Sequence, residues 1–158
     1  MQNDRPWLAH YDPGVPGTIR YPEQPLFEFL EESARKYPNR ACTVLKDSIV
    51  SYAEMSKITD RLSAALEGLG VKKGDRVGIL MPNAPEFVMA FYAILKAGAV
   101  VVATNPLYTL PEIVRQVNDS GMEVMFVLSD LYATAHAAKS QSALRALVVA
   151  QADVRVAG

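Results

Sequence analysis

The sequence predicts an α/β fold, with a mostly parallel, doubly wound sheet from about residue 75 that follows a helix–hairpin–helix segment. The main observation comes from residues 74–106, where the apolar pattern changes from strand to helix and back to strand. Such a unit forms a right-handed crossover between two parallel strands. Alternating strand and helix patterns continue to about residue 150, which extends the same sheet.

The central unit has recognisable boundaries. Residues 77–81 form an apolar run that ends at a proline, which is typical of a strand buried on both faces. Asn83 is expected to cap the following helix, with Glu86 reaching back to it in a capping box. Gly98 is expected to end that helix with a positive φ, since glycine adopts this conformation at little cost. Residues 99–103 are then predicted to be a second buried strand.

The remaining elements are predicted from the same kinds of pattern. Two more capping boxes pair a hydroxyl with a glutamate three residues later, Ser51 with Glu54 and Thr109 with Glu112. Hydrophobic periodicity and turn residues complete the prediction. The expected elements are a helix over 25–37, a hairpin of strands 41–45 and 49–52, a helix from 52 to about 69, a helix from 110 to Gly121, a strand over 124–128, a short helix over 129–139 and a strand over 147–150.

Residues 1–24 are expected to form an extended arm, and residues 25–158 one incomplete α/β domain. The arm carries prolines at positions 6, 13, 16 and 22, which disfavour regular structure. Trp7, Tyr11 and Ile19 make it too apolar for a free tail. We expect it to pack on its own domain, because termini usually dock locally. The alternative is an arm that lies across a partner subunit, so a homodimer or other self-association stays open.

Composition excludes several classes of function. Sixteen basic and 17 acidic residues give a net charge of -1, so no electrostatic footprint for nucleic acid is present. Cys42 is the only cysteine, which excludes an internal disulfide and a cysteine-based zinc site. The N-terminal residues lack a signal-peptide pattern, and polar residues interrupt the apolar stretch 79–103 before it could span a membrane. A cytoplasmic location is predicted, with peripheral contact at the inner membrane face as an alternative.

No catalytic, cofactor-binding or metal-binding residue is predicted within these 158 residues. His10 and His136 have no second metal ligand at a suitable spacing. Glycines 68, 70 and 74 follow a helix and precede a strand, whereas a dinucleotide fingerprint needs the reverse order. The other reactive side chains have structural explanations as helix caps, turn residues or a buried thiol, namely Ser51, Ser120, Ser129, Asp119, Glu123 and Cys42.

Several short sequence motifs resemble the N-terminal part of the AMP-forming acyl-CoA synthetases. The resemblance is greatest to the bacterial long-chain fatty-acid–CoA ligases of the adenylate-forming superfamily. The motifs occur in the family's order between about residues 6 and 150, and they are weak singly but specific together. Pro111 is shifted by one position from the place of the proline in the family's usual motif. Residues 151–158 match no family motif. The motifs are PWL at 6–8, YDPGVP at 11–16, VSYAEM at 50–55, KGDRV at 73–77, MPN at 81–83, LKAGA at 95–99, NPLYT at 105–109 and NDSG at 118–121.

The resemblance implies an activity for a longer parent protein. Members of the family activate a fatty acid with ATP and Mg²⁺ to an acyl-adenylate and pass the acyl group to coenzyme A. Their phosphate loop, ribose-binding acid and catalytic lysine have no matching positions here, so this chain looks like the first third of a ligase. The chain alone is therefore expected to be inactive. The alternative is a stand-alone α/β module that binds a ligand or partner without catalysis.

Overall fold

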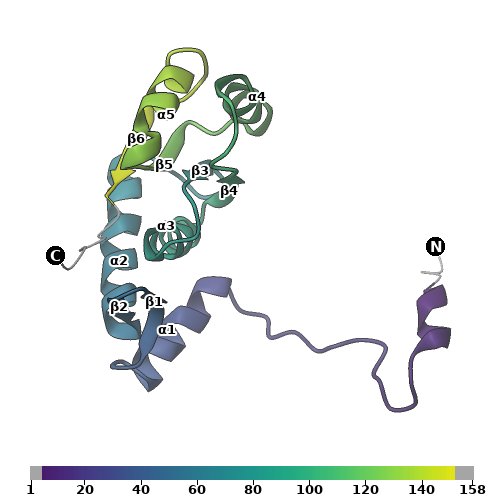
Figure 1. Cartoon of the computed structure of the whole chain (residues 1–158). Helices are drawn as coiled ribbons and strands as arrows, with labels where there is room; N and C mark the ends of the chain where they lie inside the picture. Colours follow the sequence, from purple (N-terminus) through teal and green to yellow (C-terminus); the bar gives the residue numbers. More distant parts are fainter. Residues whose placement is uncertain (1–4, 152–158) are drawn as a thin grey trace.

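A computed structural model describes residues 5–151 of the chain (Figure 1). It contains two short 3₁₀ helices, five α-helices and six strands within these residues. In chain order they are η1 (Pro6–His10), α1 (Leu26–Lys36), β1 (Ala41–Leu45), β2 (Ser48–Ser51), α2 (Tyr52–Gly68), β3 (Arg76–Leu80), α3 (Pro85–Lys96), β4 (Val100–Thr104), α4 (Leu110–Ser120), β5 (Val124–Leu128), η2 (Ser129–Leu131), α5 (Tyr132–Lys139) and β6 (Ala146–Ala150).

The four strands from β3 onward form one parallel sheet in the order β4-β3-β5-β6. The chain runs from β3 to its neighbour β4 and then crosses back to place β5 on the other side of β3. Strands β1 and β2 pair separately as the predicted antiparallel hairpin. The doubly wound α/β fold is therefore confirmed, and so is the helix–hairpin–helix segment before it.

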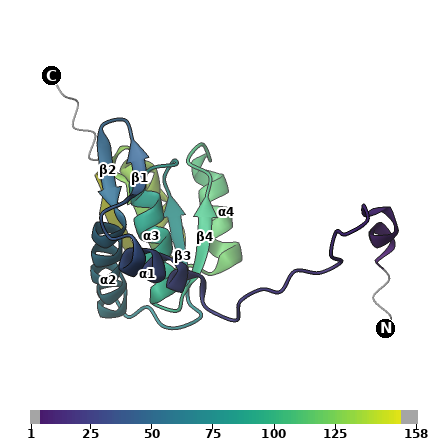
Figure 2. The same cartoon turned by 90° about the horizontal axis from the view of Figure 1, so that it is seen from below.

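Helices cover both faces of the sheet (Figures 1 and 2). Helices α2 and α3 pack on one face, where Val77, Ile79 and Phe126 lie in the core. Helices α4 and α5 pack on the other face, against Leu80 and Met125. Alternate residues of β3 and β5 thus enter opposite cores, as strand geometry requires for a sheet buried on both sides.

Gly78 allows close packing at the centre of β3. A Cβ atom at this position would lie 2.5 Å from the sulfur of Met122 and 3.1 Å from the Met125 side chain. The two methionines therefore fill the space that any larger residue at position 78 would need. This is a packing requirement, because the backbone of Gly78 has no positive φ.

The two outer strands of the sheet are less buried than the two central ones. Every residue of β5 is buried, and so are four of the five residues of β3. In contrast, Val100 of β4 and Val149 of β6 are about half exposed. The expectation that residues 99–103 form a buried strand is therefore wrong for β4. Strands β4 and β6 are less buried than the central strands because both lie at edges of the sheet. Their short apolar runs resemble those of the central strands, so composition alone did not separate edge from centre.

Two of the three predicted capping boxes are present. At the start of α2, the Ser51 amide and hydroxyl donate to Glu54 Oε2 at 2.9 and 2.7 Å. At the start of α4, the Thr109 amide and hydroxyl donate to Glu112 Oε2, both at 2.7 Å. These contacts satisfy polar groups that the helix itself leaves unpaired.

The predicted cap at Asn83 is wrong. Helix α3 begins at Pro85, and Ala84 is its N-cap, with φ -150° and ψ 162° and no side-chain hydrogen bond. Proline disfavours helical backbone at the residue before it and is itself well suited to the first helical position. Pro85 therefore places the helix start one residue later than the Asn83–Glu86 spacing suggested.

Glycines end α2 and α3 in the same way. Beyond α3, the Gly98 amide donates to the Leu95 carbonyl and the Ala99 amide to the Ile94 carbonyl, both at 3.0 Å. Gly98 has a φ of +71°, as predicted, and Gly70 plays the same part beyond α2 with a φ of +81°. This hydrogen-bond pattern is the Schellman motif, which needs a left-handed residue after the helix.

Lys96 joins the first three α-helices. Its ammonium contacts Glu31 of α1 at 2.8 Å and also pairs with Asp60 of α2, while its own side chain is only 12% exposed. Burial works to lower the pKa of Lys96, but the hydrogen bonds and charges of Asp60 and Glu31 outweigh it and raise that pKa above its usual value. One cation thus holds α1 and α2 against the end of α3.

The N-terminal arm leaves the domain at the start of α1 and runs away from it (Figures 1 and 2). Residues 5–23 are exposed throughout, so the expectation that the arm packs on its own domain is wrong. Regular structure is also present in it, since Pro6–His10 form η1 with proline at the first helical position. The described arm thus offers its apolar side chains to solvent. The division of the chain at residue 24 stays a prediction.

None of the helices within residues 5–151 is long and apolar enough to cross a membrane. This agrees with the interrupted apolar stretch seen in the sequence.

The capping boxes give the first prediction. Ser51→Ala and Thr109→Ala should each lower the free energy of unfolding by ~1 kcal/mol, the usual effect of losing an N-cap. Asn83→Ala is the matched control and should change stability little, because Asn83 does not cap α3. Urea denaturation midpoints measure all three variants. An Asn83→Ala effect as large as the other two would contradict the helix start at Pro85.

The second prediction concerns Gly98. Gly98→Val should destabilise by roughly 1–3 kcal/mol, because a β-branched residue is forced into a left-handed conformation. The new side chain would also approach Lys73 Cγ, 3.3 Å from the Cβ position. Gly68→Ala is the control, since Gly68 has no positive φ and a Cβ there meets no atom within 4 Å. Equal thermal midpoints for Gly98→Val and the unchanged chain would rule out the strained turn.

The third prediction concerns Lys96. Lys96→Met should lower the free energy of unfolding by about 1–2 kcal/mol, because Glu31 and Asp60 lose their shared cation and then repel each other. Lys72→Met, which removes an exposed cation, is the control. The added effect of Glu31→Gln should be smaller in the Lys96→Met background than alone. Additive effects in that double-mutant cycle would mean that the ion pair contributes nothing to stability.

Candidate functional site

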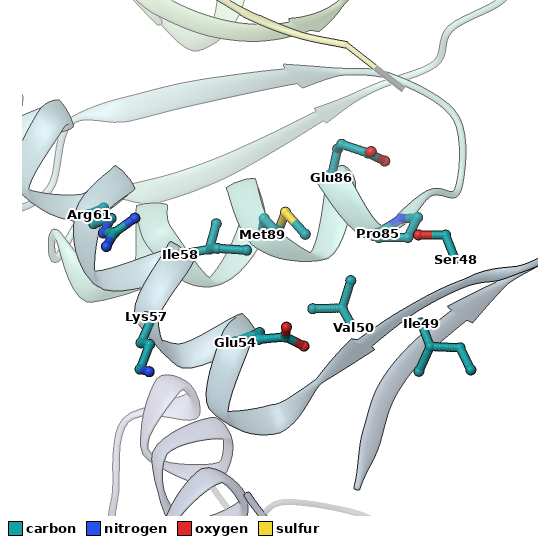
Figure 3. A pocket seen from close by; sticks show the side chains of 10 residues that line it. All are labelled: Ser48, Ile49, Val50, Glu54, Lys57, Ile58, Arg61, Pro85, Glu86 and Met89. Carbon is teal, nitrogen blue, oxygen red and sulfur yellow. The ribbon is translucent and has the colours of Figure 1, made fainter. Parts of the chain in front are cut away.

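A pocket of about 370 Å³ opens between the hairpin and the first turns of α2 and α3 (Figure 3). Its size falls within the range of small-molecule sites. Strand β2, one face of α2 and the start of α3 supply its walls. The lining residues are Ser48, Ile49, Val50, Glu54, Lys57, Ile58, Arg61, Pro85, Glu86 and Met89.

Apolar side chains form the floor of this pocket. Figure 3 shows Ile58 of α2 and Met89 of α3 next to each other, with Val50 of β2 on the hairpin side. The α2 contribution follows helical spacing, because residues three, four and seven positions apart lie on one helix face. Pro85 adds a rigid apolar wall at the start of α3.

Charged side chains surround the floor and largely offset one another. Lys57 and Arg61 of α2 carry positive charge, and Glu54 and Glu86 carry an equal number of negative charges. The Ser51 amide, and after it the Ser51 hydroxyl, hold the pKa of the Glu54 carboxyl below its usual value. Glu54 is thus an ionised part of the helix cap. Glu86 lies in the first turn of α3, where a negative charge interacts favourably with the helix dipole.

This arrangement suits binding rather than catalysis. Ser48 is the only hydroxyl among the lining residues, and neither histidine of the chain lines the pocket. A nucleophilic serine would need an adjacent base in hydrogen-bond reach. An apolar floor with charged groups around it can instead hold an apolar or aromatic group beside a cation.

The carboxyl edge of the sheet is a second candidate site, because open α/β sheets bind ligands there. The winding direction of the chain reverses between β3 and β5, and ligands of open α/β sheets bind at such a point. Thr104 ends β4 there with a buried hydroxyl that has no hydrogen-bond partner among the described residues. The Asn105 side chain accepts from the Leu107 amide at 3.0 Å, and Ser129 donates to Asp130 at 3.3 Å. These polar groups mostly stabilise the local turns.

The reactive residues considered in the sequence are dispersed. His10 lies at the end of η1 in the arm, whereas His136 lies on α5 with its ring 5.6 Å from that of Tyr132. Cys42 lies in β1, where burial raises the pKa of its thiol and so disfavours the reactive thiolate. Glu123 pairs with Arg145 at 2.9 Å. The structure brings none of these side chains together in a catalytic arrangement within residues 5–151.

The described residues do not fit a site for ATP and Mg²⁺. Gly68, Gly70 and Gly74 lie before β3, at the amino edge of the sheet and so opposite the edge where nucleotides bind in such folds. Within residues 5–151, no three His, Cys, Asp or Glu side chains gather closely enough to hold a metal ion. We therefore assign no step of a nucleotide reaction to these residues.

Sequence reasoning missed the pocket. Its α2 face could have been found, because Glu54, Lys57, Ile58 and Arg61 recur at helical spacing. The contact of that face with the hairpin and with Met89 depends on how three elements pack, which no local pattern encodes.

A family model described as "AMP-binding enzyme" matches residues 30–157. The match covers most of the domain and leaves out the N-terminal arm. It also extends beyond residue 150, so the expectation that the resemblance ends there is wrong.

Relatives and solved structures agree with this match. A long-chain-fatty-acid–CoA ligase of Bacillus subtilis is 32% identical over 149 residues, which cover 94% of this chain and 27% of the relative. A corresponding ligase of Salmonella typhimurium is 38% identical over 128 residues, 78% of this chain and 22% of the relative.

Solved structures of similar proteins share the fold. A long-chain-fatty-acid-CoA ligase of Archaeoglobus fulgidus superposes with a TM-score of 0.78 at 25% identity, covering 89% of this chain and 30% of that one. The chain thus spans about a quarter of the length of the curated relatives that it matches. On this evidence, the chain belongs to the AMP-binding enzyme family and corresponds to the N-terminal part of its fatty-acid–CoA ligases.

Proposed function

We propose that this chain is the N-terminal part of an ATP-dependent ligase that joins a fatty acid to coenzyme A. The reaction would proceed through an acyl-adenylate, with Mg²⁺ accompanying the ATP. The observation that carries the proposal is the match over nearly the whole chain to long-chain-fatty-acid–CoA ligases about four times its length. The long acyl chain is inferred from the names of these relatives, and a cytoplasmic location belongs to the same proposal.

The role of these residues in such an enzyme would be that of a scaffold. Both acyl transfers involve developing negative charge, which enzymes stabilise with preorganised donors around the phosphates and the reacting carbonyl. The described pocket has an apolar floor and balanced charges, and the glycines lie at the amino edge of the sheet. We therefore expect the chain alone to be inactive.

A second candidate is a stand-alone module that binds a ligand without catalysis. The specific observation in its favour is that helices cover both faces of the sheet and enclose two cores. A domain with both faces covered can fold independently of further chain. The pocket between the hairpin, α2 and α3 would be its binding site.

The fourth prediction tests the expected inactivity of the chain alone. Purified chain incubated with ATP, Mg²⁺, coenzyme A and fatty acids of several lengths should release no AMP or pyrophosphate above the blank. The Bacillus subtilis ligase is the positive control under the same conditions. AMP release that follows the protein through purification would contradict the scaffold role.

A binding experiment separates the scaffold role from the stand-alone candidate. The stand-alone candidate predicts that a fatty acid raises the melting temperature of the chain, and that Met89→Lys removes the rise. No thermal shift together with no turnover is the result expected for a scaffold.

A further inference from the structure

The chain leaves the sheet close to the pocket between β2, α2 and α3. Strand β6 runs parallel to β5 and β3, so its last residue, Ala150, lies at the same carboxyl edge as Leu80 of β3. Helix α3 begins at Pro85, just beyond the end of β3. Ala150 also packs against the core that α2 and α3 cover. The residues that follow β6 therefore start at the pocket's end of the sheet and on its side.

The pocket is within reach of these residues. Only β5 separates β6 from β3, which places β6 about 10 Å from β3 at the usual strand spacing. Seven more residues, 152–158, span up to ~23–25 Å when extended. They lie outside the described residues, but the family model matches the chain as far as residue 157. The matched domain thus extends past β6.

The composition of this segment suits an interface with one apolar side. Residues 152–158 read ADVRVAG, in which two valines alternate with an acid and a base. Alternate side chains of an extended backbone point to opposite sides. In that conformation Val154 and Val156 share one side of the segment, while Asp153 and Arg155 share the other.

The pocket complements this pattern. Its floor is apolar and can cover two valines, while two cations and two acids surround that floor. Their charges cancel, which suits a segment with one acid and one base better than an anionic ligand. Glu86 lies in the first turn of α3, at the carboxyl edge from which the segment starts, and is the expected partner of Arg155 (Figure 3).

Covalent connection favours this docking over binding of a separate molecule. Because β6 holds the segment next to the pocket, its effective concentration there is of the order of millimolar. A free ligand of equal affinity would have to exceed that concentration to replace it.

We propose that residues 152–158 lie across the pocket between β2, α2 and α3, with Val154 and Val156 on its floor and Arg155 paired with Glu86. The segment then closes the pocket to small ligands. This inference does not depend on the ligase role. It excludes the pocket as the binding site of a stand-alone module.

Disulfide trapping on the full chain tests the docking. Cys42 is the only cysteine, so Cys42→Ser gives a background without other thiols. In that background, Val154→Cys with Met89→Cys should form a disulfide within one chain under mild oxidation. Lys57→Cys in place of Met89→Cys repeats the test at an exposed position of the pocket, where the core is not altered.

The matched control moves one cysteine to the other side of the sheet. Leu107 follows β4, the opposite edge strand, and is 87% exposed. Val154→Cys with Leu107→Cys should form the disulfide at least about tenfold more slowly, because no docking raises the effective concentration of that pair. Equal rates for the two pairs would overturn the proposal and leave the pocket open to a small ligand. A disulfide that joins two chains would also overturn it, since the occupant would then be a second copy.

A double-mutant cycle tests the ion pair. Arg155→Gln and Glu86→Gln should each slow the cross-link between positions 154 and 89 about threefold, the usual effect of a partly exposed ion pair. Together they should slow it no more than either does alone. A cross-link rate that neither substitution changes, or effects that multiply, would contradict the pairing of Arg155 with Glu86.

Discussion

The parallel pairing of β3 with β5 is the contact on which the rest of the fold depends. Both strands are almost completely buried and give alternate side chains to opposite cores. Each flanking helix therefore packs on a surface that these two strands define. Gly78 lets Met122 and Met125 approach the centre of that surface. Without this pairing, α2 and α3 on one face and α4 and α5 on the other would not pack against the same strands.

The sequence predicted most of this fold because its signals are local. A hydroxyl three residues before a glutamate marks the start of α2 and of α4, and Gly98 marks the end of α3. Each signal relies on hydrogen bonds between residues close in sequence, so tertiary context changes them little. The prediction failed at Asn83, where two local preferences favour different starts for α3. The restriction imposed by Pro85 on Ala84 outweighed the favourable spacing of Asn83 and Glu86.

What the sequence did not predict depends on packing between distant elements. The apolar run of β4 resembles that of β3, yet only the order of strands places β4 at an edge. The pocket needs β2, α2 and α3 together, and Met89 carries no signal of its own. The packing of the arm was predicted wrongly for the same reason. Its apolar residues suggest contact with some surface, but they do not indicate which one.

The two edges of the sheet are stabilised in different ways, which bears on function. At the amino edge, arginines reach across the fold to helix ends: Arg76 donates to the carbonyls of Ser120 and Gly121 at 2.9 and 3.0 Å, and Arg145 to that of Leu69 at 2.7 Å. Such charge-assisted contacts hold separate elements together. At the carboxyl edge, Gln116 of α4 donates to the Ala103 carbonyl of β4 at 3.2 Å, whereas the Asn105 and Ser129 contacts lie within single turns. The Thr104 hydroxyl has no partner among the described residues. Among the described residues, the edge where ligands of open α/β sheets bind therefore lacks arginine contacts of this kind.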